Sequence, residues 1–360
     1  MPVLRVALDL PLHRLFEYRV DVASTADVGL RVRVPFGRGE KIGVIAGVAE
    51  QGEWPDAQLK PAGEILRDLP PLPADFFALC EFASTYYQAP FGEVVHQALP
   101  AGVRRLDPPA RRAGRVQKAK PGPLPPALTA EQVRAIEAVT VDGGYSAQLL
   151  FGITGSGKTE VYLQLVERVL ALGAQVLLLV PEINLTPQLE ARVRGRFPER
   201  TVVALHSELA EAARERNWRS AFNGEADIVL GTRLAVFTPL PRLGMIIVDE
   251  EHDASFKQQD GMRYSARDVA VVRARQTAIP ILLGSATPSL ETWANAQGGR
   301  YGMQTLRERA NPEARLPAVR VLDTRKMAMR EGISPPLVEA IRERLVRGEQ
   351  SLVFLNRRGY

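Results

Sequence analysis

Two patterns of apolar residues divide the chain. Residues 1–105 carry short runs in which apolar and polar positions alternate, separated by turns that contain Gly and Pro: VLRVAL (3–8), FEYRV (16–20), LRVRV (30–34) and KIGVIAGV (41–48). Alternation of this kind is typical of half-buried strands. A helix is expected over about 74–88, where large apolar residues recur at helical spacing: Phe76, Phe77, Cys80, Ala83 and Tyr87. The first 105 residues are therefore predicted to form a mostly-β module.

From about residue 127 the apolar runs become continuous. They are AQLLFGI (147–153), QVLLLVP (175–181), ADIVLGT (226–232), GMIIVDE (244–250) and IPILLGSAT (279–287), with helical stretches between them. Strands that are apolar on both faces belong to a parallel sheet covered by helices on each side. The predicted fold class is therefore α/β, with the N-terminal β module followed over 127–311 by a parallel α/β lobe.

After residue 311 a second series of predicted strands and helices begins. AVRVLD (318–323) and SLVFLN (351–356) predict two strands, and the stretch between them predicts a helix with Leu337, Ile341 and Leu345 on one face. Two strands and a helix bury too little surface to fold alone. We expect residues 312–360 to be the incomplete start of a second lobe, and the chain to be truncated at residue 360.

Composition excludes several classes of protein. With 46% hydrophobic and 24% charged residues, the chain is expected to be globular rather than disordered. Its one cysteine, Cys80, excludes a disulfide framework and a multi-cysteine zinc cluster within the chain, and fits a reducing compartment. No apolar run reaches the ~20 residues of a membrane span, and no signal peptide is visible. The expected location is cytoplasmic, with no membrane partner.

The charge pattern singles out one segment. The formal net charge of +5 favours a polyanionic partner only weakly. Within residues 104–120, however, seven basic residues face one acidic residue, and prolines follow at 121, 123, 125 and 126. Prolines stiffen a chain toward polyproline II. We expect residues 106–126 to be an exposed linker, which is either a solvated charge run or a contact for phosphates.

A phosphate-binding loop is predicted at GITGSGKTE (152–160). The segment follows an apolar strand and precedes a helical stretch, which is the context that a P-loop requires. Glycines let backbone N–H groups turn toward the phosphates, and the helix N-terminus adds partial positive charge. Lys158 would bridge the β- and γ-phosphates, and Thr159 would bind Mg²⁺. The predicted ATP-binding residues are Gly152, Ile153, Thr154, Gly155, Ser156, Gly157, Lys158 and Thr159.

Acidic residues end another predicted strand, in MIIVDEEH (245–252). Asp249 would hold Mg²⁺, and Glu250 would be the base that orients the attacking water. The alternative is a run of acids that caps the next helix. The presence of a P-loop in the same chain favours the catalytic interpretation of these acids over the helix cap. The predicted catalytic residues are therefore Lys158, Asp249 and Glu250.

Further motifs narrow the class of P-loop enzyme. GSATPSLET (284–292) places Ser285 and Thr287 at the carboxyl edge of the sheet, where open α/β sheets bind ligands. Gln132 lies in LTAEQVRAIEAV, upstream of the P-loop strand. Together with the two motifs above, these segments resemble the superfamily 2 helicases. The resemblance implies a RecA-like lobe, an adenine-reading role for Gln132, and a set of residues that couple nucleotide state to DNA: His252, Ser285, Ala286 and Thr287.

Three segments leave strands on the expected nucleic-acid face, namely 177–188, 231–239 and 249–274. The last of them interleaves aromatic rings with the cations of Lys257, Arg263 and Arg267. Rings that stack on bases, with cations for the backbone, suit a protein that tracks single-stranded DNA. An ordinary connection between helices is the alternative. The predicted DNA contacts are Thr232, Arg233, Phe256, Lys257, Arg263 and Tyr264.

These strings closely resemble the family of primosomal protein N′ (PriA), bacterial 3′→5′ DNA helicases that restart stalled replication forks. RVRVPFGRGEKIGVI near the N-terminus and LVFLNRRGY at the end extend the resemblance along the chain. It implies that the β module captures the 3′ end of the nascent leading strand through five residues: Phe16, Glu17, Tyr18, Gly37 and Lys60. The family more often has Asp where this chain has Glu17, so the acid is kept but its reach changes.

The same resemblance implies the cofactors and the partners. ATP and Mg²⁺ would serve the motor, forked and single-stranded DNA would be bound, and other primosome proteins and single-stranded-DNA-binding protein would be partners.

Two features depart from the family. A winged-helix domain normally occupies the interval in which this chain has only the linker, and a cysteine-rich zinc module normally begins just beyond NRRGY. Zinc is therefore implied for the full-length family, and no zinc ligand is expected in this chain.

Two other functions stay open at this point. A DNA-end-binding module with a vestigial motor would share the N-terminal resemblance, although Lys158, Thr159, Asp249 and Glu250 are all present. A P-loop kinase or transporter ATPase would share the nucleotide motifs, but the aromatic and basic loop adds nothing to that function. The predicted function is an ATP-dependent 3′→5′ DNA helicase that recognises stalled or abandoned forks and initiates restart by primosome assembly. The isolated chain is expected not to unwind DNA.

Overall fold

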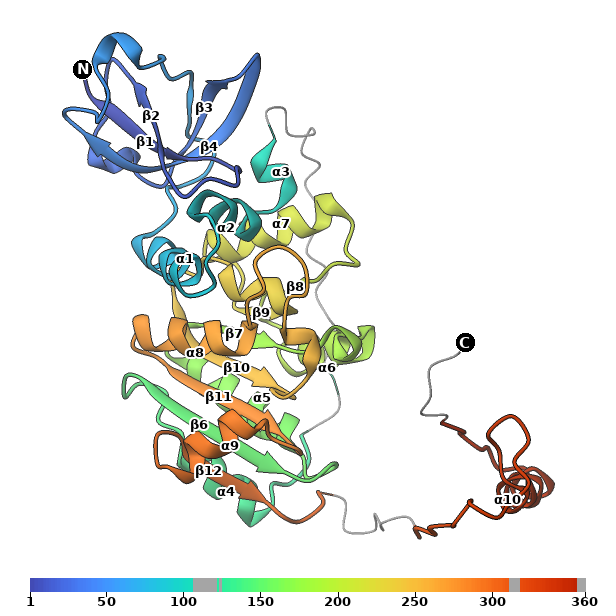
Figure 1. The fold of residues 1–360 in the computed structure, drawn as a ribbon. Helices are drawn as coiled ribbons and strands as arrows, with labels where there is room; N and C mark the ends of the chain where they lie inside the picture. Colours follow the sequence, from blue (N-terminus) through green and yellow to red (C-terminus); the bar gives the residue numbers. More distant parts are fainter. Residues whose placement is uncertain (106–121, 123–124, 311–317, 355–360) are drawn as a thin grey trace. The chain divides into compact units, whose positions relative to one another are not determined.

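The computed structural model describes the chain except for residues 106–121, 123–124, 311–317 and 355–360 (Figure 1). The chain divides into two units, 1–312 and 313–360, which are described separately. The predicted linker over 106–126, and with it the expected lack of a winged helix, lies almost entirely outside the described residues. The end of the last predicted strand, 355–356, also lies outside them.

The N-terminal module contains a five-stranded antiparallel sheet, as the alternating pattern predicts. The strand order is β2-β1-β4-β3-β5, with β1 Val3–Ala7, β2 Phe16–Arg19, β3 Arg31–Phe36, β4 Gly39–Ala49 and β5 Ile65–Leu66. Leu4, Val6 and Ile45 are fully buried in its core. The alternating pattern does not reveal β5, because a strand of two residues is too short for a period to show.

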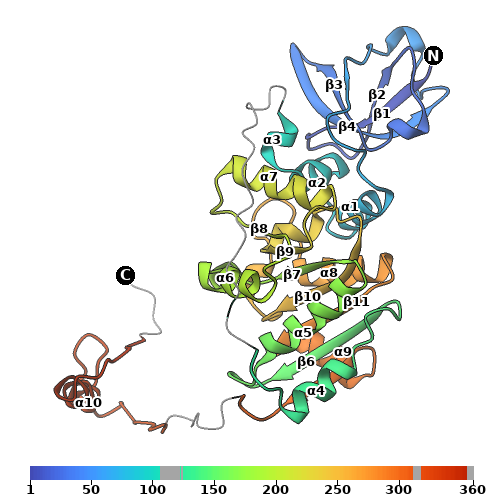
Figure 2. The ribbon, with the colours of Figure 1, turned by 180° about the vertical axis from the view of Figure 1, so that it is seen from behind.

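Three helices follow this sheet and pack against elements that cover the second one: α1 Ala74–Tyr86, α2 Phe91–Ala98 and α3 Ala101–Arg104. Figures 1 and 2 show α1 and α2 between the two sheets. Phe76 and Cys80 of α1 share one core with Ile246 and Ile281 of the second sheet. The N-terminal helices therefore complete the core of the lobe that follows them in sequence.

The second sheet has seven strands, and every pairing in it is parallel. The order is β12-β6-β11-β10-β7-β9-β8, with β6 Ser146–Gly152, β7 Gln175–Leu179, β8 Val202–Leu205, β9 Ile228–Gly231, β10 Leu243–Asp249, β11 Pro280–Ser285 and β12 Gly302–Leu306. The five continuous apolar runs become β6, β7, β9, β10 and β11. The sequence patterns miss β8, which has four residues, and β12, an edge strand with only one buried residue.

Helices cover both faces of this sheet, as a parallel sheet requires. Ile247 of β10 shares a core with α4, α5 and α6, whereas its neighbour Ile246 shares another with α1, α7 and α8. The remaining α-helices of the first unit are α4 Ala130–Glu137, α5 Lys158–Ala171, α6 Pro187–Arg196, α7 Glu211–Phe222, α8 Ala266–Gln276 and α9 Leu290–Gln297. The predicted α/β fold class is confirmed.

The second unit contains one helix, α10 Pro335–Val346, within its described residues. The helix lies where it is predicted, but no residue of α10 is buried. The two predicted strands are wrong: neither 318–323 nor 351–354 forms a strand, and Leu352 is 99% exposed. A strand needs a neighbour that pairs with its N–H and C=O groups, and the described part of this unit offers none.

We predict that Gly92→Ala destabilises the protein. A Cβ on Gly92, at the start of α2, would lie 1.9 Å from the carbonyl oxygen of Leu8. The backbone would have to move, at a cost of about 1–3 kcal/mol, measured as a lower free energy of unfolding in urea. Gly47→Ala is the matched control, because its Cβ would meet Arg5 at an ordinary 3.8 Å. Equal losses in the two variants would contradict the close approach.

Candidate functional site

The predicted P-loop connects β6 to α5 at the carboxyl edge of the second sheet. Gly155 and Gly157 have φ of +80° and +82°, in the left-handed region that glycine adopts without strain. A Cβ on Gly155 would meet no atom within 4 Å, so this part of the loop borders open space. Lys158 is buried in the first turn of α5, and its Nζ donates to the Gly152 carbonyl oxygen at 3.0 Å. The loop thus has the open, glycine-shaped backbone that a phosphate cradle needs.

The two predicted catalytic acids lie beside this loop. Asp249 ends β10 and accepts a hydrogen bond from the Tyr162 hydroxyl at 2.8 Å. Burial raises the pKa of Asp249 above its ordinary value, although the Tyr162 hydrogen bond opposes the rise. Glu250 Oε1 lies 3.6 Å from Lys158 Nζ. The structure therefore brings together the three residues predicted to be catalytic.

The site suits a magnesium nucleotide. Ser156 Oγ is buried and has no hydrogen-bond partner among the described residues, which is a state that a ligand oxygen would relieve. A nearby cation would stabilise the ionised form of the buried Asp249. Residues 152–159 would hold the phosphates, and Thr159 with Asp249 would hold Mg²⁺.

Gln132 is packed against the P-loop. Its side chain is buried, its Oε1 accepts from the Thr129 N–H at 2.9 Å, and its Nε2 donates to the Ser156 carbonyl oxygen at 3.0 Å. A Cβ on Gly157 would lie 2.2 Å from the same Nε2. These contacts make Gln132 a support of the loop; its adenine-reading role stays a prediction.

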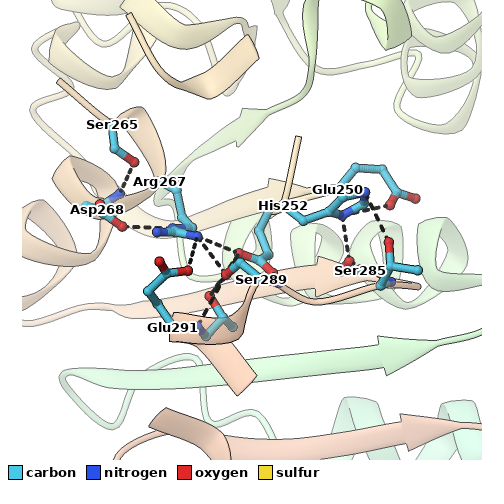
Figure 3. Close-up of polar contacts among 11 residues, drawn as sticks. Glu250, His252, Ser265, Arg267, Asp268, Ser285, Ser289 and Glu291 are labelled. Atoms are coloured by element: carbon cyan, nitrogen blue, oxygen red, sulfur yellow. Dashed lines mark hydrogen bonds and ion pairs between the residues drawn. The ribbon is translucent and has the colours of Figure 1, made fainter. Parts of the chain in front are cut away.

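The predicted coupling residues form one hydrogen-bonded group (Figure 3). His252 Nδ1 lies 2.7 Å from Ser285 Oγ, and His252 Nε2 lies 3.2 Å from Thr287 Oγ1, with Ala286 between the two hydroxyl residues in sequence. Glu250 Oε2 is 3.7 Å from His252 Nδ1. Polar contacts therefore run from the predicted base to the loop after β11.

The aromatic residues of the loop after β10 are core residues, contrary to the stacking prediction. Phe256 and Tyr264 are 2% and 0% exposed, and the ring of Tyr264 packs edge-on against Phe237 with centroids 5.2 Å apart. Neither ring can stack on a base in this structure. Lys257 and Arg263 are exposed, as a contact to a DNA backbone requires. Rings and cations alternate here because the rings of this turn pack into the core, whereas the cations are exposed to solvent.

Thr232 and Arg233 follow β9 and border a cavity of about 560 Å³. Arg233 Nη1 donates to the Ser255 carbonyl oxygen at 2.7 Å, which ties this turn to the loop after β10. Arg104 of α3 and Arg214 of α7 also line the cavity. Its lining includes three acids as well, Asp9, Glu93 and Glu182. The mixed charge means that the cavity does not by itself select a polyanion.

The residues expected at a DNA 3′ end lie on different faces of β2. Phe16 packs edge-on against Phe36 with centroids 5.6 Å apart. Tyr18, two residues on and 4% exposed, belongs to the core of the sheet, so the prediction that it lines an open pocket is wrong. Glu17 lies between them in the strand and therefore faces the other way. Its Oε2 accepts from the Glu53 N–H at 2.7 Å.

Gly37 and Lys60, the remaining residues expected at the 3′ end, are exposed. Gly37 lies in the turn between β3 and β4 with φ +60°. Two cations that sequence reasoning missed flank the nearby aromatic pair: Arg14 lies 4.9 Å from the Phe16 centroid, and Lys41 lies 5.8 Å from the centroid of its partner ring. The exposed groups near this pair therefore include two cations, although Glu40 in the same turn is also exposed and pairs with Arg33 at 3.3 Å.

Sequence reasoning also missed Tyr162, the hydroxyl donor to Asp249. Within the apolar stretch of α5 it reads as an ordinary core residue, and it is fully buried. Its spacing of four from Lys158 was the available signal, because residues four apart share one face of a helix.

We predict that Tyr162→Phe shifts the pH dependence of magnesium-nucleotide binding. The hydrogen bond from Tyr162 lowers the pKa of Asp249, so its loss raises that pKa further. Mg²⁺ needs the ionised carboxylate, so the affinity of the variant should begin to fall at a higher pH as the solution is acidified. We expect nearly equal affinities at pH 8 and a deficit of roughly three- to tenfold near pH 5.5.

A fluorescent nucleotide titrated at each pH measures this difference. Tyr145→Phe, on an exposed tyrosine outside the site, is the matched control. Superimposable pH profiles for Tyr162→Phe and the unsubstituted chain would show that the hydroxyl does not act on Asp249.

Two protein-family models match the chain. The model described as the 3′DNA-binding domain (3′BD) matches residues 5–100, and the DEAD/DEAH box helicase model matches residues 129–296. The first covers the N-terminal sheet and helices up to α2, and the second covers the lobe from α4 to α9. The two parts of the chain therefore match two separately defined domains.

Curated relatives match along the same chain. "Replication restart protein PriA" of Haemophilus influenzae is 36% identical over 100% of this chain and 59% of its own length. The Treponema pallidum protein of the same name is 37% identical over 100% of this chain and 54% of its own length. The Bacillus subtilis protein is 45% identical over 67% of this chain and 30% of its own length.

The chain thus spans 59% of the length of the Haemophilus influenzae protein and 54% of the length of the Treponema pallidum protein. Among the described residues, no helix has the length and apolar character needed to cross a membrane. The predicted family resemblance is confirmed, because the matches include both the N-terminal DNA-binding domain and the helicase lobe. This chain belongs to the family of PriA replication restart proteins, and its lobe over residues 129–296 matches the DEAD/DEAH box helicase family.

Proposed function

We propose that the chain is the nucleotide-binding and DNA-end-binding part of an ATP-dependent 3′→5′ DNA helicase that acts in replication restart. One observation carries the proposal. Polar contacts run without a break from Lys158 to Glu250 (3.6 Å), from Glu250 to His252 (3.7 Å) and from His252 to Ser285 (2.7 Å). A structural loop would not need this arrangement, whereas a motor must transmit nucleotide state from the P-loop to its DNA-binding turns.

Each part of the nucleotide site has a proposed role. ATP, bound with Mg²⁺, would supply the free energy of phosphoryl transfer. The backbone of residues 152–159 and the ammonium of Lys158 would hold the phosphates, Thr159 and Asp249 would hold the metal, and Glu250 would take a proton from the attacking water. No zinc ligand is proposed in this chain.

DNA would be held at two places. On the lobe, Arg233 and the exposed side chains of Lys257 and Arg263 would contact the backbone of single-stranded DNA. Thr232, also predicted as a DNA contact, is 4% exposed and would support this turn from beneath. On the N-terminal module, the half-buried Phe16 ring and the exposed Gly37 and Lys60 would receive the 3′ end of a nascent strand at a fork. The matched 3′DNA-binding domain supports this assignment.

The partners follow from the family. Proteins of this name act in replication restart, which supports a role in recognising stalled forks and in primosome assembly. Other primosome proteins and single-stranded-DNA-binding protein are the proposed protein partners.

Unwinding of forked DNA by the full-length protein tests the whole function, and 5′→3′ movement would refute the proposed direction.

We predict that Lys158→Ala weakens magnesium-nucleotide binding. The ammonium is the one cation near the P-loop that the proposed site places on the phosphates, and a charge-assisted hydrogen bond contributes about 1.5–3 kcal/mol. The dissociation constant should rise roughly ten- to a hundredfold, measured with a fluorescent nucleotide. Lys326→Ala, on an exposed lysine of the second unit, should leave it unchanged. An undiminished affinity in Lys158→Ala would exclude the proposed cradle.

We also predict that the 360-residue chain hydrolyses ATP no faster when forked DNA is added. In motors of this class a second lobe supplies an arginine that stabilises the charge of the transition state, and such an arginine contributes roughly 10³–10⁵ in rate. Binding of nucleotide and of DNA 3′ ends should persist, because both proposed sites lie within residues 1–312. Phosphate release with and without forked DNA measures the effect, and robust stimulation would show that a second lobe is dispensable.

A further inference from the structure

The cavity of about 560 Å³ lies at the carboxyl ends of β8 and β9, in the half of the second sheet that does not carry the P-loop. Leu205, which ends β8, and Thr232, which follows β9, line it from the sheet. Residues 97–101 line it from α2 and α3, and α7, which lies beside α3 (Figure 1), forms another wall. Its volume falls within the roughly 300–1,000 Å³ of sites for small organic molecules.

Two buried residues that line this cavity have polar side-chain groups without partners. Trp218 of α7 is 3% exposed, and its Nε1 has no hydrogen-bond partner among the described residues. Thr238 is 2% exposed, and within the described part of the chain only its backbone N–H and carbonyl oxygen form hydrogen bonds. A buried donor or hydroxyl without a partner is unfavourable, and a bound molecule with a polar edge would relieve it.

Buried apolar side chains form a further part of the lining. Leu99, Leu205 and Met262 are buried at the cavity, and the ring of Trp218 adds an aromatic surface. Apolar walls that carry a few polar groups suit a planar heterocycle, which has apolar faces and a polar edge. A nucleobase removed from its stack is held in this way, between apolar or aromatic side chains with hydrogen bonds to its edge.

The charges of the lining restrict how many phosphates it can accept. Three arginines and three acids line the cavity: Arg104, Arg214, Arg233, Asp9, Glu93 and Glu182. Arg214 lies four residues before Trp218, so the two side chains share one face of α7. Among the described residues Arg214 forms no ion pair. One phosphate beside Arg214 would gain a charge-assisted hydrogen bond, whereas the three acids oppose the larger charge of a triphosphate.

We propose that this cavity binds one nucleotide, at a site separate from the P-loop. The base would lie against the apolar residues with its edge toward Trp218 and Thr238, and the phosphate would pair with Arg214. The nucleotide belongs either to a single strand of DNA or to a free nucleoside monophosphate, which share this chemistry. A strand that contacts Arg233 would pass the cavity, because Arg233 also lines it. For a strand, the inference deepens the proposed DNA binding and rests on it.

The test uses the 360-residue chain in EDTA, which withholds the Mg²⁺ that the P-loop site requires. Two fluorescent strands of equal length are titrated. One is an oligothymidylate whose 3′ end is blocked by a phosphate, which excludes capture of a free 3′ end, and the other is an equally blocked strand of abasic residues. The dissociation constant of the abasic strand divided by that of the oligothymidylate is the base ratio. We expect a base ratio of about tenfold or more for the unsubstituted chain.

Trp218→Phe and Thr238→Val each remove one polar group at nearly constant size, and each should lower the base ratio by roughly three- to tenfold. Arg214→Gln should weaken binding of the oligothymidylate by a similar factor, about three- to tenfold. Arg216→Gln is the matched control, because Arg216 lies on the same helix but is exposed and does not line the cavity. Circular dichroism checks that each variant is folded, and if Trp218→Phe does not fold, the other two variants decide.

Calorimetric titration with thymidine monophosphate, also in EDTA, distinguishes the two sources of the nucleotide. Binding that Trp218→Phe and Arg214→Gln weaken, while Arg216→Gln leaves it unchanged, would support the site and assign it to a free nucleotide. A base ratio that the cavity variants lower, without binding of the monophosphate, would support the site and assign it to a nucleotide within a strand.

The remaining outcomes separate this inference from the proposed function. If the unsubstituted chain binds the oligothymidylate but the folded cavity variants match it with both probes, the inference is overturned and the proposed DNA binding stands. A base ratio of one, together with no binding of the monophosphate, would also overturn the inference alone. If the unsubstituted chain binds neither probe, the proposed binding of single-stranded DNA on the lobe is refuted, and the inference with it.

Discussion

The carboxyl ends of parallel strands meet along one edge of a sheet, and the candidate nucleotide site depends on that constraint. β6 leads into the P-loop, β10 ends at Asp249, and β11, which lies between them, ends at Ser285. Residues far apart in the chain therefore approach to within hydrogen-bonding distance, as His252 does with Ser285 at 2.7 Å. In an antiparallel sheet, neighbouring strands would end at opposite edges and the same residues would be separated.

A parallel sheet must also be covered on both faces, and this requirement joins the two parts of the chain. α1 and α2 follow the N-terminal sheet in sequence, but α1 packs on α8 and both helices pack on the turn after β9, so that Phe76 lies in the same core as Ile246. A partly buried ion pair crosses the same region, because Arg31 of β3 pairs with Asp68, which also lies 3.5 Å from Arg219 of α7. The proposed DNA-end site is thus anchored to the proposed motor through packing and paired charge.

The candidate site retains features that oppose folding. Burial raises the pKa of Asp249, Ser156 Oγ is buried without a partner in the described part of the chain, and Glu250 has a left-handed backbone. Features of this kind cost of order 1–3 kcal/mol each. The fully buried Tyr162 beneath the site and the saturated hydrogen bonding of Glu251 oppose any relaxation. Such a balance is expected where a bound ligand supplies the missing partners.

The sequence by itself determined the fold class and located the glycine-rich loop after β6 and the acids at the end of β10, because strand periodicity and motif spacing are local properties of the chain. It could not determine exposure, which depends on segments that are distant in sequence. Phe256 and Tyr264 fit a stacking surface by residue type, yet the turn folds them into the core. The apolar runs at 318–323 and 351–354 read as strands, yet no neighbouring strand is described to pair with them. Only the tertiary structure decided which rings are buried and that Glu251, rather than Glu250, faces the interior, because a side chain's surroundings are set by the elements packed around it.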